Sequence, residues 1–293
     1  MRWTPGSRSE NLEDRRGASP GGMGGGGRGF GGGGRLGIGG ILVLVVLSLI
    51  FKKDLVSDAI GLGGGGSGEQ PAAESGQRPP ASSSVHEDSL VDLMSAVLDS
   101  AQNNWKRLIP DYTPAKLVLF RNEVRTACGS AESASGPFYC PGDRKVYLDL
   151  GFFDQLDRQF GAPGDFAQAY VLAHEIGHHV QNLVGTERKM RAAQRDNPSA
   201  QNRLSVAMEL QADCYAGVWV FTAAKEGILH AGDLDEGLGA AAAVGDDRLQ
   251  KMASGRVNRD SFTHGSSADR RTWFKRGFDS GDPNRCDTFA EMR

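Results

Sequence analysis

The chain of 293 residues carries 33 lysines and arginines against 36 aspartates and glutamates, for a formal net charge of -3 at pH 7. This balance leaves no broad basic surface of the kind that binds nucleic acid, so we expect no nucleic-acid partner. The apolar fraction of 39% is depressed by 41 glycines, many of them near the N-terminus. The rest of the chain therefore has the composition of an ordinary globular protein.

Residues 1–35 mix arginines with glycine runs at residues 21–22, 24–27 and 31–34. A segment of this composition buries too little apolar surface to offset the chain entropy that is lost on ordering. We therefore predict that residues 1–35 are disordered.

An apolar, uncharged segment follows at residues 36–51 (LGIGGILVLVVLSLIF), between Arg35 and the pair Lys52-Lys53. It indicates a membrane helix or the core of a signal peptide, and a buried soluble helix is the alternative. A spanning helix prefers about 20 residues, but flanking basic side chains can reach the headgroups. Because no A-x-A-like cleavage site follows, we favour an uncleaved transmembrane anchor over residues 36–53.

The charges around this segment predict its orientation. Two lysines follow it closely, whereas the arginines that precede it are Arg2, Arg8, Arg15, Arg16, Arg28 and Arg35. The positive-inside rule then places the N-terminus in the cytoplasm and the rest of this single-pass protein in the periplasm or another extracytoplasmic space. Residues 54–84, which become rich in Gly, Ser, Pro and Ala, are predicted to be a flexible linker.

Residues 85–293 have the size of one globular domain with a full core. Val85–Ile109 predicts a helix, because apolar residues recur at helical spacing and Pro110 stops it. Lys116–Val124 and Arg144–Leu150 predict strands, the second with alternating apolar side chains. We therefore expect a small sheet before a mainly helical region.

An H-E-x-x-H motif lies in the apolar stretch VLAHEIGHHV at residues 171–180. Residues four apart on an α-helix lie about 40° from each other around the axis, so His174 and His178 present two imidazoles to one metal ion. Glu175 then lies close enough to handle a water molecule at that metal, as in zinc peptidases. The alternative is an amphipathic helix with two structural core histidines.

A catalytic zinc site needs a third protein ligand and leaves the fourth position to water. His179 points about 100° away from His178, and Val184 stands where the extended metzincin motif requires histidine. Downstream, Glu209 and Asp213 lie four residues apart in a second apolar helical pattern and share a helix face. We predict Glu209 as the third zinc ligand and Asp213 as the acceptor for a ligand histidine's ring N–H. The alternative is that both acids face solvent.

These motifs resemble a known architecture, the glutamate zincins, in which an HExxH helix precedes a helix with glutamate and, four residues later, aspartate. Nearly the whole chain is similar to the bacterial neutral zinc metallopeptidase family, the YpfJ-like proteins. The segments that carry this resemblance are residues 1–3 (MRW), 11–17 (NLEDRRG), 136–141 (GPFYCP), 146–150 (VYLDL), 245–250 (GDDRLQ), 262–265 (FTHG) and 286–289 (CDTF). The resemblance implies an α+β, mainly helical, zincin-like metallopeptidase domain that binds Zn²⁺.

In zincins an edge strand beside the active-site helix pairs with extended substrate. By this resemblance Lys145–Leu150 is a candidate for β-addition of a peptide. A purely structural strand is the alternative.

Two further helices are predicted at Asp233–Met252 and Ser267–Asp279, the second capped by Ser266 or Ser267. His264 precedes this cap in a loop. Because peptide hydrolysis develops an oxyanion, we predict that His264 donates to it in the transition state. The alternative is that His264 only orders the local turn.

The four cysteines permit three connectivities. We favour Cys128 with Cys140 and Cys214 with Cys286, which agrees with an oxidising compartment. Free thiols are the first alternative. A cysteine zinc site is the second, although the usual C-x2-C spacing is missing.

The sequence thus predicts a membrane-anchored peptidase in which zinc is bound by His174, His178 and Glu209. Glu175 acts as the general base on the attacking water and then protonates the leaving amine. The partners are a protein or peptide substrate and the membrane. Two alternatives stay open, namely a non-proteolytic zinc-binding membrane partner and a zinc amidase that acts on cell-wall peptides.

Overall fold

The structure, a computed structural model, describes residues 1–17 and 85–290. The predicted anchor at 36–53, the linker at 54–84 and the glycine-rich part of the predicted disordered segment lie outside the described residues. Among the helices of the described part, none combines the length and the apolar character needed to cross a membrane.

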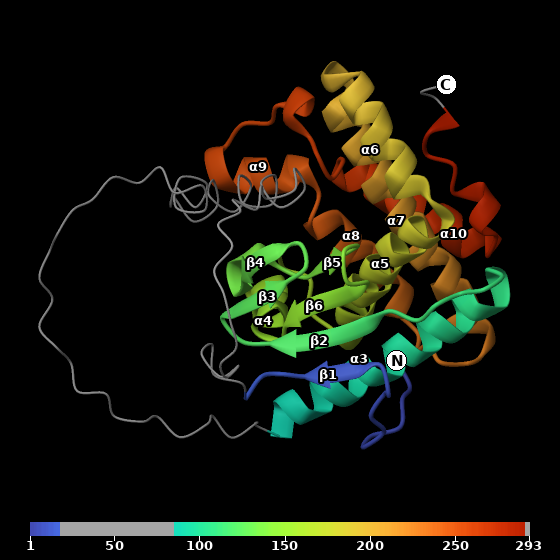
Figure 1. The fold of residues 1–293 in the computed structure, drawn as a ribbon. Helices are drawn as coiled ribbons and strands as arrows, with labels where there is room; N and C mark the ends of the chain where they lie inside the picture. Colours follow the sequence, from blue (N-terminus) through green and yellow to red (C-terminus); the bar gives the residue numbers. More distant parts are fainter. Residues whose placement is uncertain (18–84, 291–293) are drawn as a thin grey trace, which may run out of the picture.

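The described residues form a small sheet and a larger helical region (Figure 1). The strands are β1 (Leu12–Asp14), β2 (Lys116–Phe120), β3 (Glu123–Thr126), β4 (Gly129–Glu132), β5 (Phe138–Cys140) and β6 (Lys145–Asp149). The helices are α3 (Val85–Leu108), α4 (Gly151–Arg158), α5 (Asp165–Val184), α6 (Thr186–Asp196), α7 (Gln201–Lys225), α8 (Asp233–Ala243), α9 (Asp246–Ser254) and α10 (Ser267–Ser280). The predicted α+β class, mainly helical with a small sheet, is confirmed.

The main sheet has the strand order β1-β2-β6-β5, with β1, β2 and β6 parallel and β5 antiparallel to β6. Both faces of β2 are buried, which explains its continuous apolar sequence. Leu117 and Leu119 join the main core with α3 and α5, whereas Val118 and Phe120 pack under the β3–β4 hairpin. One face of the sheet therefore packs against α3 and α5.

Most of the predicted elements form, but two of them divide. The helix predicted at Asp233–Met252 is two helices, α8 and α9, because the chain turns at Gly245 to pass Ser267. A Cβ on Gly245 would lie 2.4 Å from the Ser267 backbone nitrogen, so only glycine fits there. The strand predicted at Lys116–Val124 also divides, because Asn122 has a φ of 63° and turns the chain into β3.

The prediction that residues 1–35 are disordered is wrong for residues 1–17, which the structure describes as part of the folded domain. Leu12–Asp14 pairs in parallel with Leu117–Leu119 of β2. The prediction averaged composition over the whole segment, but the first glycine run begins only at Gly21. Residues 1–17 carry enough apolar and charged side chains to bind the domain.

The proposal that Lys145–Leu150 accepts a substrate strand is also wrong, because β6 lies between β2 and β5. β2 pairs with β6 along its whole length and β5 pairs with Lys145–Tyr147, so the purely structural alternative holds. The free edge on the side of α5 belongs to β5 instead.

Both favoured disulfides are confirmed. Cys128–Cys140 joins the end of the β3–β4 hairpin region to β5, and Cys214–Cys286 joins α7 to the C-terminal segment. A hydrogen bond also joins these two segments, because Gln211 Nε2 of α7 donates to the Cys286 carbonyl oxygen at 2.9 Å.

Candidate metal centre

The H-E-x-x-H motif lies in the middle of α5, which is buried along most of its length. Its apolar side chains, among them Leu172 and Ile176, belong to the main core. The helix ends at Gly185, whose φ of 81° is a left-handed conformation that glycine adopts without strain. His174 is buried and His178 is half-buried, so the packing around α5 restricts the directions of both side chains.

A close approach of α5 and α7 brings Glu209 and Asp213 of α7 to the H-E-x-x-H motif of α5. The contact is at Gly177, where a Cβ would lie 2.9 Å from the carbonyl oxygen of Ala212. Because glycine has no Cβ, the two helices can cross at this distance. Glu209 and Asp213 then face α5 from positions one turn apart on α7.

The structure brings together His174, His178 and Glu209, whose potential ligand atoms all lie within 4.8 Å of one another. His174 Nε2 is 3.2 Å from Glu209 Oε2, and His178 Nε2 is 3.5 Å from Glu209 Oε1. Two nitrogens and a carboxylate oxygen thus point at one region, which is the donor set of a glutamate-type zinc site.

The other ring nitrogen of each histidine is occupied by an acceptor. His174 Nδ1 lies 2.8 Å from Asp213 Oδ1, and His178 Nδ1 lies 2.8 Å from Gln181 Oε1. Since a carboxylate can only accept, His174 donates from Nδ1. This leaves the Nε2 lone pairs free for a metal, so the residues present fit a zinc ion.

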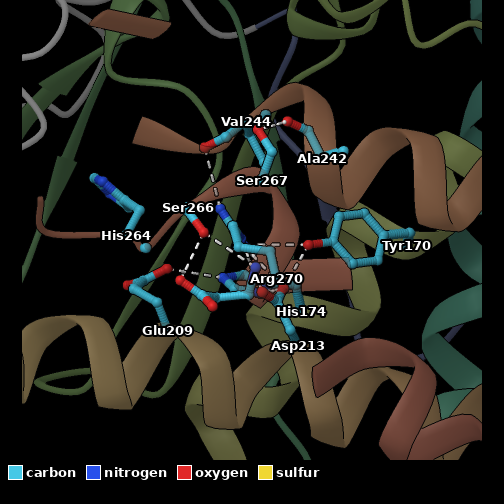
Figure 2. A network of polar contacts seen from close by, with 12 residues as sticks. Tyr170, His174, Glu209, Asp213, Ala242, Val244, His264, Ser266, Ser267 and Arg270 are labelled. Carbon is cyan, nitrogen blue, oxygen red and sulfur yellow. Dashed lines mark hydrogen bonds and ion pairs between the residues drawn. The ribbon is translucent and has the colours of Figure 1, made fainter. Parts of the chain in front are cut away.

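Asp213 is fully buried and accepts hydrogen bonds from three side chains (Figure 2). Besides His174, these are the hydroxyl of Tyr170 and the guanidinium of Arg270, which binds both carboxylate oxygens, at 2.8 and 2.9 Å. Arg270 also donates to the Tyr170 hydroxyl at 3.2 Å. Asp213 therefore keeps its charge inside the protein, and it orients His174.

The charges at the centre shift several pKa values in the metal-free protein. Burial lowers the pKa of His174, but Asp213 and Glu209 outweigh it and raise the value to about 10. Burial acts against the ionised form of Glu209, yet His178 and His174 hold its pKa below the ordinary value. The opposite charges at the centre thus stabilise one another when no metal is bound.

Glu175 is 7% exposed, and burial raises its pKa above the ordinary value. The positive charges of His178 and His174 oppose this shift. A carboxylate with a raised pKa is a better proton acceptor, as a general base requires. Its place on α5, next to His174, agrees with the predicted role.

His264 lies in the loop before α10, on the same side of Arg270 as Glu209 (Figure 2). Its Nδ1 is 3.2 Å from Asp246 Oδ1, and the other carboxylate oxygen of Asp246 accepts from the backbone nitrogens of Thr263, His264 and Gly265. Asp246 therefore fixes both the loop and the imidazole. Burial lowers the pKa of His264, but the hydrogen bond to Asp246 and the negative charge of Glu209 outweigh it and raise the pKa above its ordinary value.

His179 is separate from this cluster, as its position on α5 predicts. Its Nε2 donates to the Thr113 carbonyl oxygen at 2.7 Å, and its Nδ1 lies 3.0 Å from the Tyr139 hydroxyl. Burial lowers the pKa of His179 to about 4, so it is neutral. It holds α5 to the sheet through β5.

Four residues that contact the centre were not predicted to do so: Tyr170, Gln181, Asp246 and Arg270. Gln181 could have been found, since it follows His178 by three residues and so shares its helix face. Tyr170, four residues before His174, carries the same signal. Arg270 has no local signal, because α10 reaches Asp213 only through the tertiary fold.

Comparisons with known proteins give a consistent result over nearly the whole chain. A profile of the family described as "Putative neutral zinc metallopeptidase" matches residues 1–289. A relative from Escherichia coli (strain K12), "Uncharacterized protein YpfJ", is 47% identical over 297 residues, which cover 99% of each chain. An uncharacterized protein of Mycobacterium tuberculosis (strain ATCC 25618 / H37Rv) is 48% identical over 197 residues, 64% of this chain and 66% of its own. No solved structure matches the chain.

Proposed function

Because the chain belongs to the neutral zinc metallopeptidase family, we propose that it hydrolyses peptide bonds with zinc held by His174, His178 and Glu209 and with Glu175 as general base. The observation that carries this proposal is the convergence of the three side chains, with both histidine Nδ1 atoms already bonded elsewhere. A site of this kind presents only its Nε2 atoms and a carboxylate to the metal.

Zinc bound there would supply a Lewis acid that lowers the pKa of water to about 7 and polarises a carbonyl group. Within the described residues the cluster offers three ligands, so a fourth position stays open for water or substrate. An open position favours a catalytic site over a purely structural one. It supports the proposal over a non-proteolytic zinc-binding partner.

Glu175 takes a proton from the water molecule while the water oxygen attacks the carbonyl carbon of the peptide. It then delivers this proton to the amide nitrogen, the carbon–nitrogen bond breaks, and an amine and a carboxylic acid are left. The burial that raises the pKa of Glu175 suits both steps, since the residue must accept a proton and later release it.

His264 donates a hydrogen bond to the developing oxyanion in this proposal. Asp246 accepts from Nδ1, so Nε2 is the nitrogen that remains for the substrate. The electrostatic influence of Glu209 on His264 supports a position at the same centre. Hydrogen-bond donors of this type contribute about 3–4 kcal/mol to transition-state stabilisation where they have been removed by mutation.

The expected membrane anchor lies outside the described residues and stays a prediction, as does the extracytoplasmic location. Two disulfides support an oxidising compartment, because such bonds are rare in the cytosol. A protein and a cell-wall peptide offer the same amide group, so the amidase alternative shares this chemistry.

The test compares the parent protein with Glu175→Gln on a peptide library derived from a bacterial proteome. We expect Glu175→Gln to bind as much zinc as the parent and to lose at least about 100-fold in cleavage rate. Glu123→Gln, at an exposed position on β3, is the matched control and should cleave at the parent rate. Equal cleavage by Glu175→Gln and the parent would refute the assignment of the base.

A further inference from the structure

Residues 1–17 contact three parts of the domain, namely the sheet, α3 and the first residues of α5 and α8. In the chain, 67 residues separate them from α3. On the sheet, β1 pairs with β2 (Figure 1). Leu117 donates its backbone N–H to the Asn11 carbonyl oxygen, and Arg15 donates to that of Leu119, both at 2.8 Å. Lys145 of β6 reaches across to Glu13 at 2.8 Å. Backbone and side chains both hold this strand.

Along α3, polar groups of the segment contact a row of acidic side chains. The Ser9 hydroxyl donates to Asp99 at 2.6 Å, and the Gly6 N–H donates to Asp92 at 2.6 Å. Arg8 also pairs with Asp92, at 3.0 Å. The Arg16 side chain is 9% exposed and pairs with Glu87 at 3.2 Å.

At the start of the segment, Met1 is 4% exposed and belongs to the main core. Its amino group lies 2.7 Å from Asp165 Oδ2 and 3.4 Å from Asp233 Oδ2, the first residues of α5 and α8. With Glu236 these acids form a second cluster of potential metal ligands, and the ammonium group already pairs with two of the three. The Arg2 N–H donates to the Ile228 carbonyl oxygen at 2.7 Å.

We infer that residues 1–17 and the domain of residues 85–290 lie on the same side of any membrane to which this protein attaches. Both segments form one body, so a chain that leaves it after residue 17 and returns at residue 85 must cross a membrane an even number of times. The uncharged run at 36–51 is long enough for at most one crossing, which needs about 20 residues. A single crossing would instead pull β1 away from β2.

A single-pass anchor over residues 36–53 and the orientation that the arginine count predicts are both incompatible with one body on one side of a membrane. Three of the arginines before residue 36, namely Arg8, Arg15 and Arg16, form ion pairs with acidic residues of the described part. These charges therefore have a role within the fold that is independent of membrane orientation. The two disulfides favour the oxidising side for both segments. Nothing in this inference depends on peptidase activity.

The test uses the full chain in its native membrane, with one added cysteine at Glu10 or at Met252. Both positions are exposed, the first in the N-terminal segment and the second in α9. Intact cells are treated with a membrane-impermeant maleimide, and labelling is normalised to that after lysis. We expect the two positions to be labelled alike. One labelled and the other protected would overturn the inference.

A second measurement checks that β1 is docked in the purified full-length protein. Glu13→Lys places a cation beside Lys145 and should lower Tm by roughly 2–4 °C. Combining Glu13→Lys with Lys145→Glu should recover part of this loss, because the pair then attracts again. If Glu13→Lys is as stable as the parent, β1 does not dock and the inference fails.

Discussion

At the scale of single residues, Asp213 connects the candidate metal centre to the rest of the fold. It accepts from His174 of α5, from Tyr170 one turn earlier and from Arg270 of α10. Burial raises its pKa, but Arg270 and His174 outweigh this and keep it below the ordinary value. The buried carboxylate is thus stable only as part of the whole network.

We predict that Asp213→Asn weakens zinc binding by about 10- to 100-fold, because a neutral amide oxygen is a weaker acceptor for the His174 Nδ1–H and does not neutralise Arg270. Competition with a chromophoric chelator measures this affinity. Asp154→Asn, at an exposed position on α4, is the matched control and should bind zinc as the parent does. An unchanged affinity in Asp213→Asn would show that the network does not orient the ligand.

Helical spacing was sufficient to predict the three potential metal ligands His174, His178 and Glu209, and Asp213 as the partner of His174. Arg270 could not be predicted in the same way. It is 57 residues from Asp213 in the chain, and a basic residue on an exposed, charged helix gives no sign of burial. Its role follows only from how α10 packs on α7.

At the scale of elements, the packing of α10 on α7 depends on two glycines. A Cβ on Gly277 of α10 would lie 1.9 Å from the Cys214 carbonyl oxygen, and a Cβ on Gly217 of α7 would lie 2.0 Å from that of Phe274. The backbones of the two helices therefore touch. This contact places Arg270 beside Asp213 and Cys214 within reach of Cys286.

We predict that Gly277→Ala destabilises the protein by about 3 kcal/mol, since the methyl group forces two backbones apart. Gly239→Ala is the matched control, because that glycine also lies in a helix but has nothing within 4 Å of its Cβ position. The control should be unchanged or more stable by up to about 1 kcal/mol. Urea unfolding of both variants decides the matter, and equal stability would rule out the close contact.

Strand β1 gives the structure a specific sensitivity to acid. Burial raises the pKa of Glu13, but Lys145 and Arg15 outweigh it and lower the value from 4.5 to about 2. Because the pKa in the folded state is below that in the unfolded state, Glu13 stabilises the fold above pH 4.5. This contribution is lost as the pH falls from 4.5 to about 2.

We therefore predict that the parent loses more stability than Glu13→Gln between about pH 5 and about pH 3. The comparison uses metal-free protein, and the difference between the two variants cancels the titration of all other groups. Urea unfolding at the two pH values measures it. Parallel losses in the two proteins would mean that Glu13 has no ionic partner in the folded state.

Among the strands, the elements that were missed are the short ones. Strands β1 and β5 have three residues each, too few to show an alternating pattern. Their absence from the predicted sheet also led to the wrong assignment of β6 as an edge. Helices α3 and α10, by contrast, have long apolar repeats or a serine cap, and Ser266 does accept from the Asp269 N–H as an N-cap.

At the scale of the whole molecule, the described part joins two segments that are distant in sequence. Residues 1–17 contact α3, α5 and α8, and the disulfide Cys214–Cys286 fixes the other end of the chain to α7. The disulfide pairing was predicted correctly as the favoured one of three connectivities, with Cys128 and Cys140 flanking a short loop. The docking of residues 1–17 was not, because composition alone says nothing about specific ion pairs.

Zinc K-edge X-ray absorption on the purified full-length protein tests the metal centre most directly. The account predicts a first shell of nitrogen and oxygen atoms only, at about 2.0–2.2 Å, with two imidazoles in it. It also predicts that Glu209→Ala alters this shell or loses the metal. A sulfur atom at about 2.3 Å, or a spectrum unchanged by Glu209→Ala, would contradict the assignment of His174, His178 and Glu209.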